Sequence, residues 1–281
     1  MAPPTYGDLG KNARDVFGKG YHFGLWKLDV KTKTSTGVEF STGGVSNQET
    51  GKVFGTLETK YKFKEYGVTF AEKWNTDNVL VTEVTAQDFL KGLKVSLDTS
   101  FKPQTGDKSI KAKTEYKNQT VAANADLDFK TGAPLVNASL VFGYEGWLAG
   151  VSSKFDSQKA KLVGNSFSLG YAAGNMVFHS SVDNGNDFNG SIYHKVNSNF
   201  ETGVTLGWSA ANNDTRMAVG CKYNLDGDTA VRAKVNKNLH IGLSYQQKLR
   251  EGVTIALSTL VDGKNFHEGG HKVGFSLELE A

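Results

Sequence analysis

One short stretch carries residue types that could bind a metal. His267-Glu268-Gly269-Gly270-His271 matches a pattern in which two histidines one helical turn apart bind zinc and the glutamate acts on a metal-bound water. That chemistry needs a helix, whereas two glycines here precede a segment of strand-like alternation. We therefore expect no metal site, and no catalysis either, because no nucleophile with a positioned base is visible in the sequence.

A second candidate is a carboxylate among apolar residues in the stretch VTFAEKW, residues 68–74. If this stretch is a strand, Phe70 and Trp74 share one face, and Glu72 lies on that same face. Lys73 points the other way and cannot easily pair with Glu72. What the apolar face touches decides what this carboxylate can do.

Basic side chains recur on the polar face of other alternating stretches. Amines and guanidinium groups at such positions can bind phosphates and carboxylates. The candidates are Lys94, Lys113, Arg232 and Lys234, together with Lys11, Arg14 and Lys19 near the N-terminus. The net charge of +3 is mild and no run of Lys or Arg occurs, so the composition does not favour a nucleic-acid partner.

The elements that carry these residues alternate with a period of two from about residue 21 to the end. In residues 93–101 the odd positions are mostly apolar, and Lys94, Ser96 and Asp98 lie opposite them. Turn signals such as Asp226-Gly227-Asp228 separate the stretches. At about 14 residues per strand and turn, the chain has room for about eighteen or nineteen antiparallel strands.

The composition alone resembles a soluble protein, with 22% charged residues and no apolar run near the roughly 18 residues of a membrane helix. A soluble sandwich or lipocalin-like barrel would also alternate. However, a closed sheet of this size leaves an aqueous channel, and its second face here is densely charged. Tyr and Trp near strand ends fit an aromatic girdle. The pattern therefore favours a membrane barrel.

The first twenty residues differ from the rest. Leu9, Ala13 and Val16 fall at helical spacing, and Thr5 is placed to cap the start. The spacing predicts a short amphipathic helix and a glycine-rich linker over residues 1–20, followed by a barrel over 21–281. The helix is too short to span a bilayer. These residues leave open whether it lies on the membrane surface or in the pore.

Several stretches together resemble the voltage-dependent anion channel, the porin of the mitochondrial outer membrane. They include PPTYGDLGK at residues 3–11, EYGVTFAEKWNTDN at 65–78, GYEGWLAG at 143–150 and LVDGKNFHEGGHKVGFSLELEA at 260–281. The resemblance covers essentially the whole chain. It implies an all-β transmembrane barrel of about nineteen strands, with the first and last strands parallel and the short N-terminal helix inside the pore.

The resemblance also implies a function: a voltage-gated, weakly anion-selective pore of the mitochondrial outer membrane that passes ions, ATP, ADP and other small metabolites. The basic residues named above are then predicted to hold nucleotide phosphates in transit. Gly92-Leu93-Lys94 matches a proposed nucleotide contact of the family, although it also fits a plain strand start. No cofactor is expected; ATP or NADH would bind as permeants or regulators.

Further residues and partners follow from the same resemblance. Lys272, Gly274, Leu277 and Leu279 fit the mitochondrial barrel-assembly signal. The glutamate that matches Glu72 is associated with hexokinase docking, contacts between barrels and gating, so hexokinase, apoptosis regulators, lipids and a second copy are expected partners. Two alternatives stay open for Glu72: a functional residue, or a tolerated charge that reaches toward the membrane surface. A docking barrel that conducts little and a soluble carrier are the alternative functions.

Overall fold

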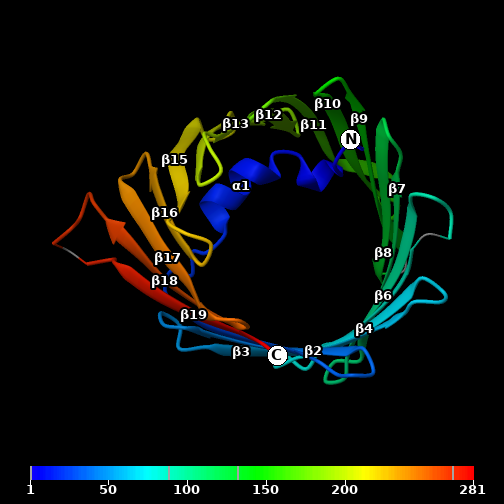
Figure 1. Cartoon of the computed structure of the whole chain (residues 1–281). Coiled ribbons are helices and arrows are strands. Elements are labelled where there is room, and N and C mark those ends of the chain that lie inside the picture. The colour runs from blue at the N-terminus through cyan, green and yellow to red at the C-terminus, as the bar shows by residue number, and fades with distance from the viewer. Residues whose placement is uncertain (1, 88, 132, 268) are drawn as a thin grey trace.

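A computed structural model describes residues 2–87, 89–131, 133–267 and 269–281. In it the chain closes into one sheet of nineteen strands (Figure 1). The strands are β1 (Leu25–Lys33), β2 (Val38–Asn47), β3 (Val53–Phe63), β4 (Val68–Asn75), β5 (Leu80–Gln87), β6 (Leu93–Lys102), β7 (Asp107–Lys117), β8 (Val121–Thr131), β9 (Ala133–Tyr144), β10 (Trp147–Asp156), β11 (Lys161–Ala173), β12 (Met176–Asp183), β13 (Asp187–Lys195), β14 (Phe200–Ser209), β15 (Asp214–Asn224), β16 (Thr229–Asn236), β17 (His240–Arg250), β18 (Val253–Asp262) and β19 (Lys272–Glu280).

The barrel closes through one parallel pair. Successive strands are antiparallel neighbours, and an odd number of them leaves the first and the last running in the same direction. β1 accordingly pairs in parallel with β19, from Trp26 opposite Phe275 to Lys31 opposite Glu280. The predicted all-β barrel with parallel first and last strands is confirmed.

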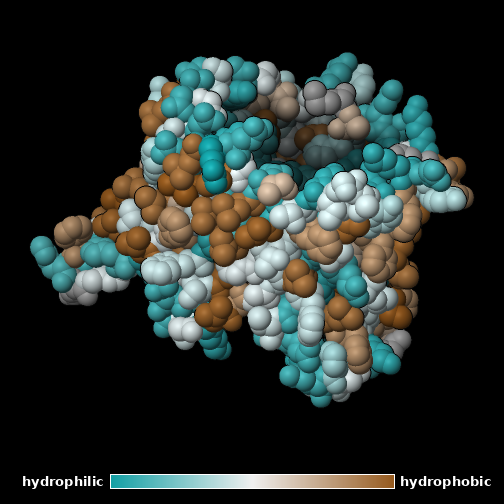
Figure 2. Space-filling view, turned by 60° about the horizontal axis from the view of Figure 1, so that its bottom comes forward, coloured by the Kyte–Doolittle hydropathy of each residue, from teal (hydrophilic) through white to brown (hydrophobic). Residues whose placement is uncertain are grey.

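The two faces of the sheet differ as the alternation predicts. Large apolar side chains on the outward parity are exposed, among them Trp26, Phe142 and Leu206. Figure 2 shows hydrophobic residues gathered on the outer surface of the barrel. In water this much exposed apolar surface would be unfavourable, whereas a lipid-facing band requires it. No helix in the described residues is long and apolar enough to cross a membrane.

The N-terminal segment, residues 2–24, lies inside the ring of strands (Figure 1). It contains a short 3₁₀ helix, η1 (Tyr6–Asp8), and one α-helix, α1 (Lys11–Gly18). α1 lies against β13, β14 and β15, and η1 lies against β9 and β10. The prediction of a helix inside the pore is confirmed.

The expectation of one continuous helix capped by Thr5 is wrong. Gly10, at φ +68°, separates η1 from α1. Its backbone lies against the His179 ring, so a Cβ at this position would come within 2.7 Å of Nδ1. The Thr5 hydroxyl donates to the Asp8 carboxylate at 2.7 Å and caps no backbone N–H.

Candidate pore and its inner wall

The N-terminal segment lies on a row of lumen-facing glycines that we call the glycine track. Its members are Gly143, Gly150, Gly203, Gly220, Gly242 and Gly274 on β9, β10, β14, β15, β17 and β19. A Cβ at Gly150 would come within 2.8 Å of the Leu9 side chain, and one at Gly220 within 2.9 Å of Phe17. Glycine therefore lets the segment approach the backbone of the wall closely.

The apolar side of the segment is buried against the same wall. Leu9 is 2% exposed and packs with Ala122 of β8 and Val141 of β9. Ala13 and Val16 of α1 are also buried. We call the lumen face of β8 to β19 the covered wall. The segment is thus held there by burial of apolar surface.

Lys234 of β16 fastens the end of α1. Its ammonium group donates to the Phe17 carbonyl at 2.6 Å, which satisfies one of the carbonyls left unpaired at a helix C-terminus. The same ammonium lies 4.0 Å from the Tyr21 ring centroid and 5.0 Å from that of Phe23.

Arg232, also on β16, lies under the linker that follows. It is 8% exposed, and its Nη1 donates to Gln246 at 2.9 Å. Its guanidinium lies so close to Gly20, at φ +78°, that a Cβ there would collide with it. The Ser244 hydroxyl donates to the Gly20 carbonyl at 2.6 Å. The glycine at position 20 thus has a structural role: it lets the linker lie against Arg232.

The linker side chains are neutral where they meet the wall. Burial raises the pKa of Tyr21 to about 12. Burial, together with the nearby Lys27, lowers the pKa of His22. Both shifts oppose a charge on the side chain at this contact.

The basic residues of the segment differ in what they bind. The Arg14 guanidinium donates to the carbonyls of Leu9, at 2.5 Å, and Gly7. Lys11 and Lys19 extend toward the lumen, with 54% and 66% of their side chains exposed. Lys11 lies 3.2 Å from Asp8, whose pKa is lowered by the hydrogen bond from Thr5 and by Lys11 itself.

Lys94 and Lys113 lie on the other side of the lumen, on strands β2 to β7, which we call the opposite arc. α1 lies away from this arc in Figure 1. Lys113 of β7 forms an ion pair with Asp98 at 2.6 Å. Lys94 of β6 stands opposite Glu115 in the sheet register. Acids and bases therefore alternate along this part of the wall.

The nine predicted pore residues consequently fall into separate groups. Five of them, Lys11, Arg14, Lys19, Arg232 and Lys234, come together at the N-terminal segment, and Lys94 and Lys113 lie on the opposite arc. Gly92, at φ +82°, directly precedes β6, and its carbonyl accepts from the Lys117 N–H. Leu93 stands opposite Tyr116, on the outward face. Of the three residues 92–94, Lys94 is the one with lumen parity.

Glu72 lies on the outer face of the barrel. Its side chain is exposed, and its cross-strand neighbours are Thr59 of β3 and Thr82 of β5. Within the described ranges no ion pair to Glu72 is found. The carboxylate therefore faces the region that the apolar band assigns to lipid.

The four residues of the assembly pattern all lie on β19, at the seam. Leu277 and Leu279 face outward beside Leu28 and Val30 of β1. The Lys272 ammonium lies 2.7 Å from Glu49. Gly274 lies against the His22 carbonyl and cannot accept a Cβ without displacing the linker.

The described residues of the histidine motif are not helical. Phe266 and His267 lie in the connection between β18 and β19, and Glu268 lies outside the described residues. The His271 ring accepts from the Asp262 N–H at 3.2 Å and contacts the Phe266 carbonyl at 3.0 Å. Across the described ranges, no group of three or more His, Cys, Asp or Glu is placed to hold a metal ion.

Comparison with known proteins identifies the family of this barrel. Residues 2–274 match the model of the family described as eukaryotic porin. The chain belongs to the eukaryotic porin family. A "Voltage-dependent anion-selective channel" of Drosophila melanogaster is 57% identical over 282 residues, covering all of both chains. The prediction that the chain is a porin rather than an enzyme is confirmed by this membership.

Two vertebrate porins are similar over nearly the same length. "Non-selective voltage-gated ion channel VDAC2" of Xenopus laevis is 55% identical, covering 99% of both chains. The protein of the same name in Homo sapiens is 54% identical and covers 99% of this chain and 95% of its own length. The resemblance inferred from short stretches thus extends over the whole barrel.

The sequence analysis missed the glycine track and Ser244. A signal for the track was present, because glycine inside a strand marks a bulge or a close approach of another backbone. Gly150, Gly203, Gly220 and Gly242 each take a lumen-parity position where other strands carry charge. Ser244 had no such signal, since serine is ordinary on a wet face.

Proposed function

We propose that this porin is a voltage-gated, weakly anion-selective pore of the mitochondrial outer membrane that passes ions, ATP, ADP and other small metabolites. The observation that carries the proposal is a closed nineteen-strand barrel whose lumen holds a basic N-terminal segment to one side. A barrel of this strand number leaves an aqueous channel. The names of the relatives agree on voltage dependence and so support a voltage-gated pore; one relative is named anion-selective and the other non-selective, which is compatible with a weak preference at most.

Anion preference would arise from the exposed bases around the narrowed lumen. Lys11 and Lys19 project from the segment, and Lys94 and Lys113 from the opposite arc. Phosphates of a passing nucleotide would meet them as point charges. Salt screens charges beyond about 8–10 Å, so the preference is weak. Arg232 and Lys234 act differently, because Arg232 is buried under the linker and the Lys234 ammonium is held by the Phe17 carbonyl at the end of α1.

Voltage would act on the same segment. It carries Lys11, Arg14 and Lys19 against Asp8 and Asp15, a net charge of +1. Moving one elementary charge through 100 mV is worth about 2.3 kcal/mol. A voltage therefore contributes a bias of at most this size, for charge that moves along the pore axis, against the hydrogen bonds and the apolar contacts that hold the segment.

The proposal is tested by single-channel recording in a planar bilayer under a KCl gradient. We expect large current steps, an anion-signed reversal potential and lower conductance at high voltage of either sign. Lys11→Glu with Lys19→Glu should reduce the anion preference, whereas Lys52→Glu in the β2–β3 turn should not. Absence of steps from a folded, inserted barrel would contradict the pore, and an unchanged preference in the double variant would contradict the role of the segment.

A second candidate function is docking, and the lipid-facing carboxylate Glu72 favours it. An acidic side chain inside the apolar band is unfavourable there, although less so than a base. We propose that Glu72 contributes to docking of hexokinase or apoptosis regulators, or to contacts with a second copy. Glu72→Gln should weaken hexokinase retention on liposomes or change barrel association, with Glu65→Gln in the β3–β4 turn as control. Unchanged retention and association would remove this role.

We also propose that the end of β19 serves as the barrel-assembly signal. Leu277 and Leu279 lie on the outward face, where a receptor could read them before the barrel closes. Leu277→Ser with Leu279→Ser should slow assembly into isolated mitochondria, compared with Leu257→Ser on β18. Equal assembly rates would contradict the signal, and assembly into other membranes alone would contradict the mitochondrial location.

A further inference from the structure

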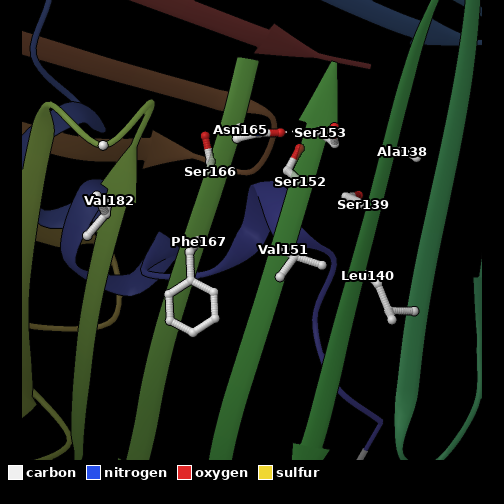
Figure 3. A pocket seen from close by; sticks show the side chains of 11 residues that line it. Ala138, Ser139, Leu140, Val151, Ser152, Ser153, Asn165, Ser166, Phe167 and Val182 are labelled. Carbon is white, nitrogen blue, oxygen red and sulfur yellow. Dashed lines mark hydrogen bonds between the residues drawn. The ribbon is translucent and has the colours of Figure 1, made fainter. Parts of the chain in front are cut away.

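A groove of about 520 Å³ interrupts the outer face of the barrel across strands β9 to β12. Its walls are mainly apolar and are formed by Leu140, Val151, Phe167 and Val182 (Figure 3). All four lie on the outward parity of their strands. In a bilayer, lipid must therefore fill this groove.

One end of the groove is polar. Ser153 of β10 and Asn165 of β11 stand opposite each other on the outward parity, and the Ser153 hydroxyl donates to Asn165 Oδ1 at 3.1 Å (Figure 3). The Asn165 backbone N–H donates to Asn184 Oδ1 at 3.0 Å, which ties β11 to the next turn. Gly185 follows in that turn and adds no side chain to the groove.

A bulge sets this polar end apart from the regular sheet. The register of β10 and β11 shifts between Lys154 and Phe155, so that Gly164 pairs with Lys154 and Leu162 with Phe155. Val163 is the extra residue. Bulges bend a strand and re-aim its side chains. Here the bulge lies directly beyond Asn165, at the mouth of the groove.

The polar end of the groove has a hydrogen-bond donor without an acceptor, the side-chain amide of Asn165. The Ser153 hydrogen is directed to Asn165 Oδ1, and the two Nδ2 hydrogens of Asn165 have no partner among the residues that the structure describes. Unpaired amide donors are costly in a region without water. An acceptor supplied by lipid at this depth would satisfy them.

The depth of the pair identifies the acceptor. β10 ends at Asp156, three residues beyond Ser153. At about 3.3 Å per residue and a tilt of about 40°, the pair lies roughly 8 Å below the end of the strand. We take the charged turn after β10, with Asp156, Lys159 and Lys161, as the membrane surface. The pair then lies near the level at which a bilayer changes from headgroups to acyl chains. The acyl ester carbonyls found there accept hydrogen bonds but cannot donate them, so they are suited to pair with the free Asn165 amide.

We propose that the groove binds one glycerophospholipid. Its ester carbonyl accepts from Asn165 Nδ2, and its acyl chain lies along Val151 and Phe167 toward the middle of the membrane. The site is formed entirely by the outer wall, so it does not depend on conduction through the lumen.

The test compares diester phosphatidylcholine with its diether analogue, which lacks the ester carbonyls. The full-length barrel is loaded with an equal mixture, and the retained lipid is measured by native mass spectrometry during detergent dilution. We expect the native chain to retain the diester about fivefold better, the effect of one hydrogen bond. Equal retention would overturn the proposal without need of any variant.

Substitution then locates the effect. Asn165→Leu should remove the preference for the diester, and Thr259→Leu, on the outward parity of β18, should keep it. Asn165→Gln retains the amide and should keep part of the preference, which guards against a folding defect in the first variant. Displacement of the bound diester by cholesterol at equal concentration would assign the groove to a sterol and overturn the phospholipid assignment. A preference that survives in Asn165→Leu would also overturn the proposal.

Discussion

The two sides of the lumen are built from different residues. The covered wall presents glycine and hydroxyl side chains to the N-terminal segment, including Gly203, Gly220 and the buried Ser244. The opposite arc presents ion pairs to water, such as Lys113 with Asp98. Small neutral residues let the segment approach the backbone of the covered wall, and the two cations that it also meets there, Arg232 and Lys234, are each engaged in a hydrogen bond within the chain. The opposite arc meets only water and can carry exposed charge. The contrast separates residues that hold the segment from residues that act on permeating ions.

The largest expected effect comes from adding bulk to the covered wall. Gly220→Val places methyl groups where the Phe17 ring lies, with Cβ alone 2.9 Å from Cε1. Overpacking of this kind costs about 1–3 kcal/mol, and we expect the upper end because the ring is also confined by Gly203. The melting temperature should fall, and trypsin should cleave the segment faster.

The control for this substitution is Gly190→Val. Gly190 of β13 stands opposite Leu206 on the outer face, and a Cβ there meets no atom within 4 Å, so this variant adds the same bulk to a strand without touching the segment. If both variants melt and are cleaved alike, the glycine track does not hold the segment.

A smaller effect is expected from removal of the Lys234 ammonium. Lys234→Met keeps much of the side-chain length but loses the hydrogen bond to the Phe17 carbonyl and the contact with Tyr21. Hydrogen bonds to charged groups contribute about 1.5–3 kcal/mol, and we expect the lower end in this water-filled lumen. Thermal unfolding in detergent measures the loss. Lys248→Met, at an exposed lysine of β17, should have little effect on thermal unfolding. A loss of equal size there would contradict a specific role of the Lys234 ammonium in holding α1.

Reversing charge on the opposite arc should alter ion preference without loosening the segment. Lys94→Glu with Lys113→Glu places acids beside Asp98 and Glu115. We expect the anion-to-cation permeability ratio to fall by about twofold, because screening limits the reach of wall charges. The reversal potential under a KCl gradient reports the ratio. Lys64→Glu in the β3–β4 turn is the control. An unchanged permeability ratio in the double variant would mean that the N-terminal segment alone sets the ion preference.

The smallest effect concerns pH and the linker. Burial lowers the pKa of His22 in the docked linker, so the docked form favours the neutral ring. Docking is then fully stabilised above the ordinary histidine pKa of about 6.5 and weakens as pH falls through that value toward the lowered one. Tryptic cleavage within the segment should therefore speed up from pH 7.5 to pH 5.5, relative to a cleavage site in an exposed turn.

His22→Gln is the matching variant for this effect, because it cannot titrate. The pH dependence of cleavage should become shallower in it. An identical pH dependence in the native chain and the variant would assign the effect to another group.

Much of the barrel could be predicted from the sequence, because strand parity is a local property. The alternation in residues 93–101 placed Lys94 on the lumen face and Leu97 on the outer face, as the register has them. An odd strand number then required a parallel seam. The resemblance supplied the strand number and the place of the helix, which the twenty N-terminal residues alone left open.

The contacts across the lumen could not be predicted in the same way. Lys234 and Phe17 are separated by 217 positions, and parity shows that a lysine faces the lumen but not what it meets there. Nor did helical spacing anticipate the break at Gly10, which is set by the His179 ring on the facing wall. Long-range packing decided both.

The most direct test of the difference between the two walls is a pair of distances between spin labels, measured by double electron–electron resonance in lipid nanodiscs. Cys221, the one cysteine of the sequence, is first replaced by serine. Spin labels at Asn12 and Thr205 report the distance from α1 to the covered wall. Labels at Asn12 and Lys94 report the distance from α1 to the opposite arc. The account predicts a short, narrow distribution for the first pair and a clearly longer one for the second. Equal distances, or a shorter one to Lys94, would contradict the placement of the segment on the covered wall.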